Sequence, residues 1–395
     1  MQPTCQTLKA HLRPEDRREP KNGHKTCQSG RLESSRRAPY DGAMAGIAAG
    51  RPPLQIGSFQ PPTRVFLAPM AGFTDLPFRR LVRECGGCGL ATTDLLNCRS
   101  VLAGHPTALR LAETNDDDSP VGMQLYGNDT DPLPEAADWA VGRGIDVLDI
   151  NMGCPVDKVC KKNGGSLLLC DPERTVRLVE RILAAVRGRV PVTAKLRLGW
   201  DDDHLTGPRL AQMLESVGIA AIAIHGRTTE MKFRGQVRLE GIGRVVEAVR
   251  DIPVLGNGDI ETPQDAEHMM RTTGCDGIML ARAATRQPWL LSRIHQLLEH
   301  GQDPGELDHH GILRVIRRHV ELCREHCEER RSLHVLRSRI SRYARSLGHV
   351  KPLKEAFRLA ENTDEMLVAI NDWLERPAPR RRDRQSQSLA CPSQP

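Results

Sequence analysis

Short apolar runs alternate with longer amphipathic stretches along most of this chain. From about residue 60, eight apolar runs of strand length follow one another, at 65–68, 90–93, 122–126, 147–150, 192–198, 220–224, 253–255 and 277–280. Amphipathic helical patterns lie between most of them, for example over 173–186 and 210–217. Short runs that are apolar throughout are typical of parallel strands covered by helices on both faces.

Eight such strand–helix units predict an α/β fold, specifically a closed (β/α)8 TIM barrel. An open doubly wound sheet is the competing fold, and it usually carries a Gly-rich dinucleotide-binding turn after its first strand. The first run here is followed by Pro69-Met70-Ala71-Gly72 instead. This sequence favours the barrel.

The chain divides further by composition. Residues 1–55 have no hydrophobic period and are rich in charge, Ser, Gly and Pro, so we predict a disordered N-terminal extension. Met44 near its end offers an alternative translation start. The barrel is predicted over 56–305. Apolar residues at helical spacing predict a small all-helical domain over 306–376, and residues 377–395 are predicted to be a disordered tail.

Composition indicates the expected cellular compartment of the protein. The chain has 395 residues, 39% of them hydrophobic, and no apolar run approaches the roughly 20 residues that a membrane helix needs. Twelve cysteines in a long chain without a secretion signal are expected to be reduced. We therefore expect a cytoplasmic protein with no membrane contact, and a monomer.

Charge is concentrated in the predicted helical domain. The net charge of the chain is only +6, but residues 311–351 hold eleven Arg and Lys against four Glu. A phosphate-bearing partner explains such a stripe as well as a solvated helix face does. On the first interpretation, Arg337, Arg339 and Arg342 are candidates for binding substrate.

In a TIM barrel the active site lies at the C-terminal ends of the strands. Nearly every predicted strand here ends in a polar or charged side chain, which a purely structural barrel does not need. The clearest case is the fourth strand, which runs into Asn151, Gly153, Cys154 and Pro155. Gly and Pro force a turn there, so Cys154 is held at the barrel mouth and is a candidate for chemistry.

The last two strands suggest an anionic cofactor. Gly256-Asn257-Gly258-Asp259 and the turn after residue 280 lie where barrels commonly hold a phosphate through backbone N–H groups. Lys195 would complement a negative charge at the same mouth. Flavin mononucleotide (FMN) fits this arrangement.

Five motifs in this order resemble the tRNA-dihydrouridine synthases, with the B-type bacterial branch the most similar. The resemblance covers about residues 54–375, and the motifs begin at Ala68 (APMAG), Asp149 (DINMGCP), Ala194 (AKLR), Ile224 (IHGRT) and Gly256 (GNGDI). It implies a flavin-dependent oxidoreductase on a TIM barrel, which reduces the C5–C6 double bond of specific uridines in tRNA with FMN and NADPH.

The resemblance also implies residue roles. Cys154 would be the catalytic acid, which suits a thiol with a pKa near 8.5 because it is mostly protonated at neutral pH. The substrate would meet Asn151, Arg197 and Arg227. The cofactor would be bound by Pro69, Met70, Ala71, Gln124, Lys195, His225, Asn257, Gly258, Asp259, Ala281 and Arg282.

Two features depart from the family pattern. The family usually has Gly where this chain has Ala281, and the stretch 161–165 differs from the B-type pattern. Two other functions remain open. A different FMN barrel enzyme, such as a dihydroorotate or dihydropyrimidine dehydrogenase, would act on a free base, and the basic helical domain would then have no purpose. A catalytically idle RNA-binding protein would not need Cys154 and Lys195.

Other polar residues have structural interpretations. Cys85 and Cys88 have zinc-like spacing but no second Cys pair at ligand distance in the sequence, so we expect plain thiols and no metal. Cys323 and Cys327 are expected to be packed on a helix. Asp94 has two interpretations, a rim carboxylate near the substrate and the N-cap of the helix after the second strand, and we favour the cap.

Overall fold

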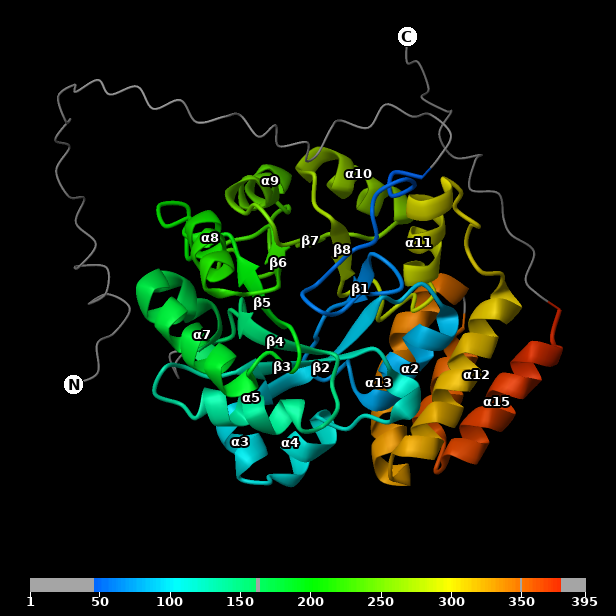
Figure 1. Cartoon of the computed structure of the whole chain (residues 1–395). Helices are drawn as coiled ribbons and strands as arrows, with labels where there is room; N and C mark the ends of the chain where they lie inside the picture. Colours follow the sequence, from blue (N-terminus) through cyan, green and yellow to red (C-terminus); the bar gives the residue numbers. More distant parts are fainter. Residues whose placement is uncertain (1–45, 161–163, 349, 378–395) are drawn as a thin grey trace, which may run out of the picture. The chain divides into compact units, whose positions relative to one another are not determined.

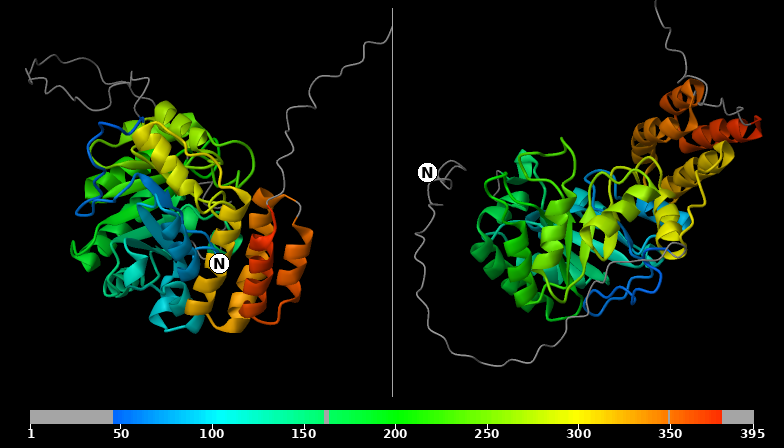
Figure 2. Two further views of the ribbon diagram at one scale, coloured as in Figure 1. Left: turned by 90° about the vertical axis from the view of Figure 1, so that its right-hand side faces the viewer. Right: turned by 90° about the horizontal axis from the view of Figure 1, so that it is seen from above.

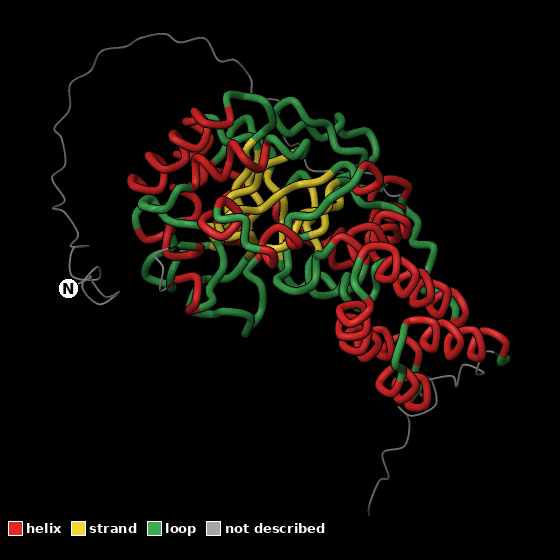
Figure 3. Tube along the Cα trace, turned by 90° about the horizontal axis from the view of Figure 1, so that it is seen from below, coloured by secondary structure: helices red, strands yellow, loops and turns green. Residues whose placement is uncertain are grey.

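The computed structural model describes residues 46–160, 164–348 and 350–377, which belong to one compact unit. Eight parallel strands form a closed barrel in chain order, with β8 paired to β1. This closure confirms the predicted TIM barrel and excludes the open sheet. The strands, yellow in Figure 3, each overlap one predicted run: β1 Val65–Leu67, β2 Leu90–Asn97, β3 Val121–Tyr126, β4 Val147–Met152, β5 Val192–Arg197, β6 Ala221–His225, β7 Val254–Asn257 and β8 Gly277–Leu280.

Helices surround the barrel (Figure 1). The predicted helices 173–186 and 210–217 correspond to α7 and α8. The elements between and after the strands are α2 Leu76–Cys85, α3 Cys98–Leu102, α4 Pro106–Leu111, the 3-10 turn η1 Asp116–Asp118, α5 Leu133–Val141, α6 Asp157–Cys160, the 3-10 turn η2 Gly165–Cys170, α7 Pro172–Val186, α8 Gly207–Val217, α9 Leu239–Ala248, α10 Pro263–Thr273 and α11 Leu290–His300.

Local signals fix where these helices begin and end. In α10, Thr262 and Asp265 form a reciprocal capping box, and Pro263 occupies the first turn, where its missing N–H costs nothing. The helix stops at Gly274, whose φ of +70° is a conformation that glycine adopts without strain. Such signals are local in the sequence, which is why the barrel helices could be predicted from it.

The barrel interior is filled by side chains and is not a pore. Phe66, Leu90 and Met279 belong to an apolar cluster that also includes Leu54 and Ile56 from the segment before β1. Ile56 and Phe59 form a short antiparallel bridge there. The chain therefore joins the barrel core before the first strand begins.

The predicted boundary of the N-terminal extension at residue 55 is wrong for its last ten residues. Ile47 and Ala48 are buried in the main core, and the Ala48 N–H donates to the Leu298 carbonyl oxygen on α11 at 2.8 Å. The apolar residues in 46–56 show no period, so the pattern could not reveal this packing. Residues 1–45, including Met44, and the predicted tail from 378 lie outside the described residues.

The predicted helical domain is present as four helices, α12 His309–His326, α13 Glu329–Leu347, α14 Lys351–Leu359 and α15 Thr363–Glu375. They run from golden yellow (α12) to red (α15) in Figure 2, where they lie together outside the ring of the barrel. The helix α12 packs against α13, α15 and the barrel helix α2. Leu313 and Leu336 are buried in the same continuous core as the barrel helices. The helical domain is thus fixed to the barrel by apolar contact.

Candidate active site

A pocket of about 500 Å³ opens at the C-terminal ends of the barrel strands. It brings together residues from all eight strands or the loops that follow them and one arginine of α13. The predicted site residues that line it are Pro69, Met70, Ala71, Gln124, Asn151, Cys154, Lys195, Arg197, His225, Asn257, Gly258, Asp259, Ala281, Arg282 and Arg342.

The turn after β4 orients Cys154. The Asn151 side-chain oxygen accepts hydrogen bonds from the backbone N–H groups of Gly153, at 3.4 Å, and Cys154, at 3.0 Å. This local bond from an Asn side chain to the backbone two and three residues ahead closes the turn. Asn151 was predicted to bind substrate; it lines the pocket, and its side-chain oxygen also shapes the turn that carries Cys154.

A chain of buried hydrogen bonds supports that turn from below. Thr193 and Gln124 each donate to the carboxylate of Asp149 at 2.6 Å. Asn151 donates to the Gln124 side-chain oxygen at 2.9 Å. The Gln124 amide has two N–H donors, so one remains to bond a ligand in the pocket. A buried network whose members satisfy one another holds both Gln124 and Asn151 rigid.

The environment of Cys154 keeps its thiol protonated. Burial raises its pKa, and the cationic Lys195 and Arg197 nearby oppose the rise without cancelling it. A thiol in this state is a proton donor at neutral pH. A thiolate nucleophile would need a neighbouring base or a dominant positive charge to lower its pKa.

Lys195, on the neighbouring strand β5, places a cation in the pocket close to Cys154. Its ammonium donates to the Asn257 side-chain oxygen at 3.0 Å, and Asn257 in turn donates to the Met279 carbonyl oxygen at 2.7 Å. Burial, and secondly the charge of Arg197, lowers the pKa of Lys195 to about 8. Lys195 is therefore mostly protonated at neutral pH.

His225 is neutral. Burial, reinforced by the charges of Lys195 and Arg197, holds its pKa well below the usual value of 6.5. Its Nε2 lies 3.2 Å from the guanidinium of Arg227, a group that can only donate. The ring nitrogen Nε2 is therefore the acceptor, and the second nitrogen carries the proton.

Arg227 does not line the pocket, although it was predicted to bind substrate. Its side chain is 2% exposed and donates to the carbonyl oxygens of Arg234 and Gly235 and to the Asp259 carboxylate. It ties down the loop after β6. The Asp259 carboxylate also accepts a hydrogen bond from Arg282 at 3.1 Å and so orients that arginine. Of the groups of Asp259, only the backbone N–H is then suited to bind a phosphate.

The three arginines predicted to bind substrate from α13 have different places. Arg342 lines the pocket and Arg337 lines a second, basic groove. Arg339 is 2% exposed and donates to the carbonyl oxygens of Gly72 and Phe73. A buried side chain cannot meet an RNA backbone, so the prediction for Arg339 is wrong. The charge count along the helix could not show which face is buried.

Other residues of the mouth were missed. Phe233 is 54% exposed and Val156 48% exposed at the pocket, and the Arg197 guanidinium lies 5.4 Å from the Phe233 ring centre. An aromatic residue shortly after the His225-Gly226-Arg227 turn was the available signal. Asp94 was also misassigned: the cap of α3 is Asn97, and Asp94 accepts from the Gly72 N–H at 2.6 Å.

Comparison with known proteins agrees with this geometry. The dihydrouridine synthase (Dus) family description matches residues 66–376. The chain belongs to the dihydrouridine synthase family. It is 33% identical to tRNA-dihydrouridine synthase B of Xanthomonas axonopodis pv. citri over 322 residues, which are 82% of this chain and 96% of the relative.

A second relative and a solved structure are also similar to this chain. A probable tRNA-dihydrouridine synthase of Mycobacterium tuberculosis is 34% identical over 323 residues, with 80% of this chain and 83% of the relative covered. A structure of morphinone reductase in complex with tetrahydroNAD superposes with a TM-score of 0.43 at 14% identity, covering 66% of this chain and 93% of that one.

The pocket suits the FMN that the family resemblance implies. Its lining is mainly apolar around Met70 and Met279, as a flavin ring requires, and Lys195 and Arg282 supply cations for the anionic end. Gly258 has a φ of +124°, and a Cβ there would lie 2.6 Å from Val237 and 2.9 Å from the His225 ring. Only glycine lets the chain pass so close beneath the pocket wall.

The two departures have different outcomes. Ala281 lies partly buried in the turn after β8, where the Ala284 N–H donates to its carbonyl oxygen at 3.0 Å, so the methyl group does not disrupt the turn. The second departure is the stretch 161–165, of which residues 161–163 lie outside the described residues.

In the described part of the chain, Cys98, Cys275 and Cys323 are buried, while Cys85 and Cys88 are partly buried. Burial raises the pKa of Cys85 to about 12 and of Cys88 to about 11. On α12, Cys323 is buried beside His319, whose ring nitrogen bonds the Tyr343 hydroxyl at 2.8 Å. Within the described ranges, no group of three or more His, Cys, Asp and Glu is placed to hold a metal ion. The same ranges contain no helix with the length and apolar character needed to cross a lipid bilayer.

Proposed function

We propose that this chain reduces the C5–C6 double bond of uridines in tRNA, with FMN bound in the pocket and NADPH as the source of electrons. When bound, FMN supplies the hydride for C6 of the base. The observation that carries the proposal is the pocket that brings Cys154, whose backbone N–H is held by Asn151, close to the Lys195 ammonium. Burial raises the pKa of the Cys154 thiol and so favours its protonated form. Cys154 gives its proton to C5.

The other pocket residues bind and orient. When FMN is bound, Gln124 would offer its remaining amide N–H to the cofactor, and Lys195 would place a positive charge beside it. The pocket residues Asn257, Gly258, Ala281 and Arg282 would hold the phosphate end of FMN. Arg197 donates to the Gly153 carbonyl oxygen at 2.7 Å, which fixes the turn that aims Cys154 at the base. General acid catalysis by such a positioned group contributes typically 10²–10⁴-fold in rate.

A basic groove favours tRNA over a free base as substrate. This groove, of about 610 Å³, lies between α13 and α14, and Arg337, Lys351, Lys354 and Arg358 line it with a single acidic residue, Glu355. A small pyrimidine needs no such surface, whereas a uridine inside folded tRNA must be extruded at a cost of a few kcal/mol and needs a grip on the backbone. An idle RNA-binding protein would need no thiol and cation side by side in a pocket.

The test is direct. The purified chain is incubated with FMN, NADPH and an unmodified tRNA transcript, and dihydrouridine is measured by mass spectrometry, with free uracil and orotate in parallel reactions. The proposal predicts dihydrouridine in the tRNA only. Turnover of a free base with none in tRNA would replace this function with that of a free-pyrimidine dehydrogenase.

We further propose NADPH in preference to NADH, action in the cytoplasm and a monomeric state. Stopped-flow reduction of bound FMN by each dinucleotide tests the first of these. Light scattering of the purified chain tests the last, and a mass of twice the chain's would contradict it.

A further inference from the structure

The loop between β1 and α2, residues 68–75, forms one wall of the active-site pocket. Its side chains Met70, Ala71 and Phe73 line the pocket directly. The loop is tightly turned: the Met70 carbonyl oxygen accepts from the Phe73 N–H at 2.8 Å, and the Thr74 hydroxyl accepts from the Met70 N–H at 3.1 Å. Any shift of the loop would move the wall.

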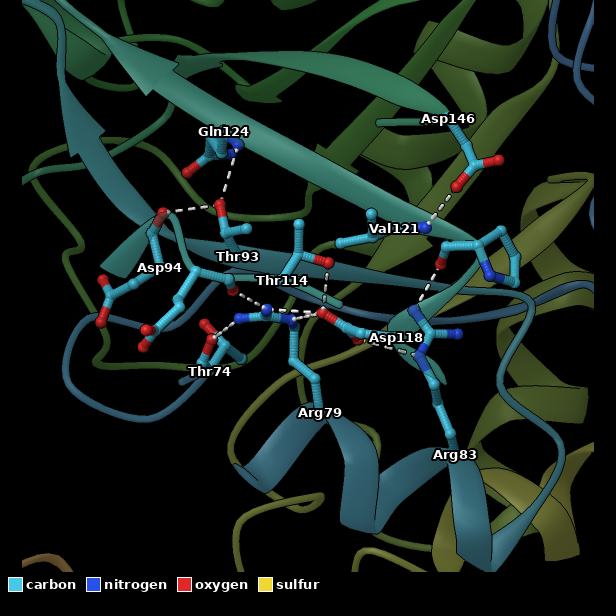
Figure 4. Close-up of polar contacts among 12 residues, drawn as sticks. Thr74, Arg79, Arg83, Thr93, Asp94, Thr114, Asp118, Val121, Gln124 and Asp146 are labelled. Carbon is cyan, nitrogen blue, oxygen red and sulfur yellow. Dashed lines mark hydrogen bonds and ion pairs between the residues drawn. The ribbon is translucent and has the colours of Figure 1, made fainter. Parts of the chain in front are cut away.

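The barrel holds this loop from one side. The Asp94 carboxylate on β2 accepts from the Gly72 N–H at 2.6 Å. Arg79 on α2 donates to the Thr74 carbonyl oxygen at 2.6 Å, as Figure 4 shows. Both contacts come from elements adjacent to the loop in the barrel.

The helical domain holds the loop from the other side. Arg339 on α13 donates to the carbonyl oxygens of Gly72, at 3.1 Å, and Phe73, at 2.9 Å. Gly72 is thus bonded through its N–H to the barrel and through its carbonyl oxygen to α13. Arg339 lies more than 260 residues along the chain from these partners.

Arg339 also clamps the loop through Phe73. Its guanidinium carbon lies 4.0 Å from the Phe73 ring centre and 5.2 Å from that of Phe78, and Arg342 approaches the Phe73 ring to 4.3 Å. Cations at these distances from aromatic rings attract their faces. The pocket-lining ring of Phe73 is therefore fixed by two arginines of α13.

The burial of Arg339 without a close counter-ion is energetically unfavourable, and this points to a positioning role. Arg339 is 2% exposed, and its nearest carboxylate, Asp75, is 5% exposed and 3.9 Å away. In the described part of the chain, Asp75 Oδ1 and one guanidinium nitrogen of Arg339 have no hydrogen-bond partner. A buried arginine with a loose ion pair stabilises a fold poorly compared with an apolar side chain. Its best contacts are the two loop carbonyls.

We propose that Arg339 is a positioning residue for the flavin: it locks the β1–α2 loop, so that a docked helical domain and a preformed cofactor wall depend on each other. This inference rests on the proposed function for the identity of the cofactor. Arg339 does not line the pocket and acts through Gly72 and Phe73.

The experiment compares Arg339→Met, which has no donor, and Arg339→Lys, which keeps the charge beside Asp75 but lacks the planar guanidinium, whose Nη2 donates to both loop carbonyls and whose carbon lies 4.0 Å from the Phe73 ring centre. The control is Arg330→Met, at an exposed position on the same helix. Amide hydrogen exchange is followed in the FMN-free chains for residues 70–75 and for β4 and β5. FMN dissociation constants and thermal midpoints are measured in parallel.

The proposal predicts faster exchange of residues 70–75 in Arg339→Met, unchanged exchange in β4 and β5, and FMN binding weakened about tenfold, the effect of losing one hydrogen bond to a charged group. Arg339→Lys is expected to show a smaller change of the same kind, and Arg330→Met none. Loop exchange and FMN affinity equal to wild type in both Arg339 variants would overturn it. If the wild-type chain itself fails to bind FMN, the proposed function fails, while the exchange data still report whether Arg339 holds the loop.

Discussion

At the scale of single residues, the protonation states of the pocket decide its chemistry. Burial acts in opposite directions on acids and bases, because it disfavours the charged form of each. The thiol of Cys154 therefore stays protonated and His225 stays neutral. Lys195, with a pKa of about 8, is still mostly protonated at neutral pH. The positions of these residues after predicted strands were enough to predict that they belong to the site. From the ordinary pKa of a thiol the sequence also predicted a protonated Cys154, but it could not predict the lowered pKa values of Lys195 and His225, which depend on burial by other strands.

Lys195 makes FMN binding depend on pH. Its ammonium attracts the anionic cofactor, and it loses this charge as the pH rises through about 8. We therefore expect FMN affinity to fall between about pH 7 and pH 9, because only the protonated lysine attracts an anion. Flavin fluorescence titration measures this. In Lys195→Met, affinity should be lower and flat over that range; a parallel fall in wild type and variant would show that another group titrates.

The same shift has a consequence for stability. In the unfolded chain the pKa of a lysine is about 10.4, above the folded value of about 8. Between these values the unfolded state binds the proton and the folded state does not, so the contribution of Lys195 to stability rises with pH in that window.

At the scale of elements, the barrel strands and helices follow from local pattern, and their anchoring does not. The capping residues of α10 are four or fewer residues from the turn that they close. By contrast, Asp118 in η1 joins α2 through two arginines, with Arg79 at 2.6 Å and Arg83 at 3.0 Å (Figure 4). An ion pair across more than 30 residues leaves no periodic signal. For the same reason Asp94, which bonds Gly72, was misread as a helix cap.

The buried Asp118 should carry much of the stability of this corner. Replacement of Asp118 by Ala leaves the fully buried Arg79 without its counter-charge, which typically costs about 3–5 kcal/mol of unfolding free energy. Its neighbour Asp117 is 72% exposed and pairs with Arg80 at the surface; Asp117→Ala should cost about 0–1 kcal/mol. Urea unfolding of the two variants measures the difference, and equal losses would contradict this account of the corner.

At the scale of the whole molecule, the basic stripe predicted on the helical domain separates into two faces. The arginines of α12 are paired with carboxylates, Arg317 with Glu321, Arg318 with Glu84 and Arg324 with Asp364. Those of α13 and α14 around Arg337 form the groove. The sequence predicted the domain and its charge. It could not divide the charge, since Glu84 and Asp364 come from distant parts of the chain.

The groove should carry the salt-sensitive part of tRNA binding. A triple variant with Arg337, Lys351 and Lys354 changed to Glu should bind tRNA at least tenfold more weakly and show a smaller dependence on salt, because fewer phosphate contacts release counterions. The control carries the same charge change at Arg314, Arg317 and Arg324 on α12. Filter binding over a salt series measures both, and equal losses in the two variants would show that net charge, and not the groove, matters.

The central claim is that Cys154 donates a proton to a uridine of tRNA reduced in this pocket. Its most direct test is a single turnover: the chain with FMN is reduced by NADPH without oxygen and mixed with unmodified tRNA, and dihydrouridine is followed by mass spectrometry in wild type and Cys154→Ala. We predict that both chains bind FMN and are reduced, and that the variant forms dihydrouridine about 10²–10⁴-fold more slowly. Equal rates in the two chains would contradict the account.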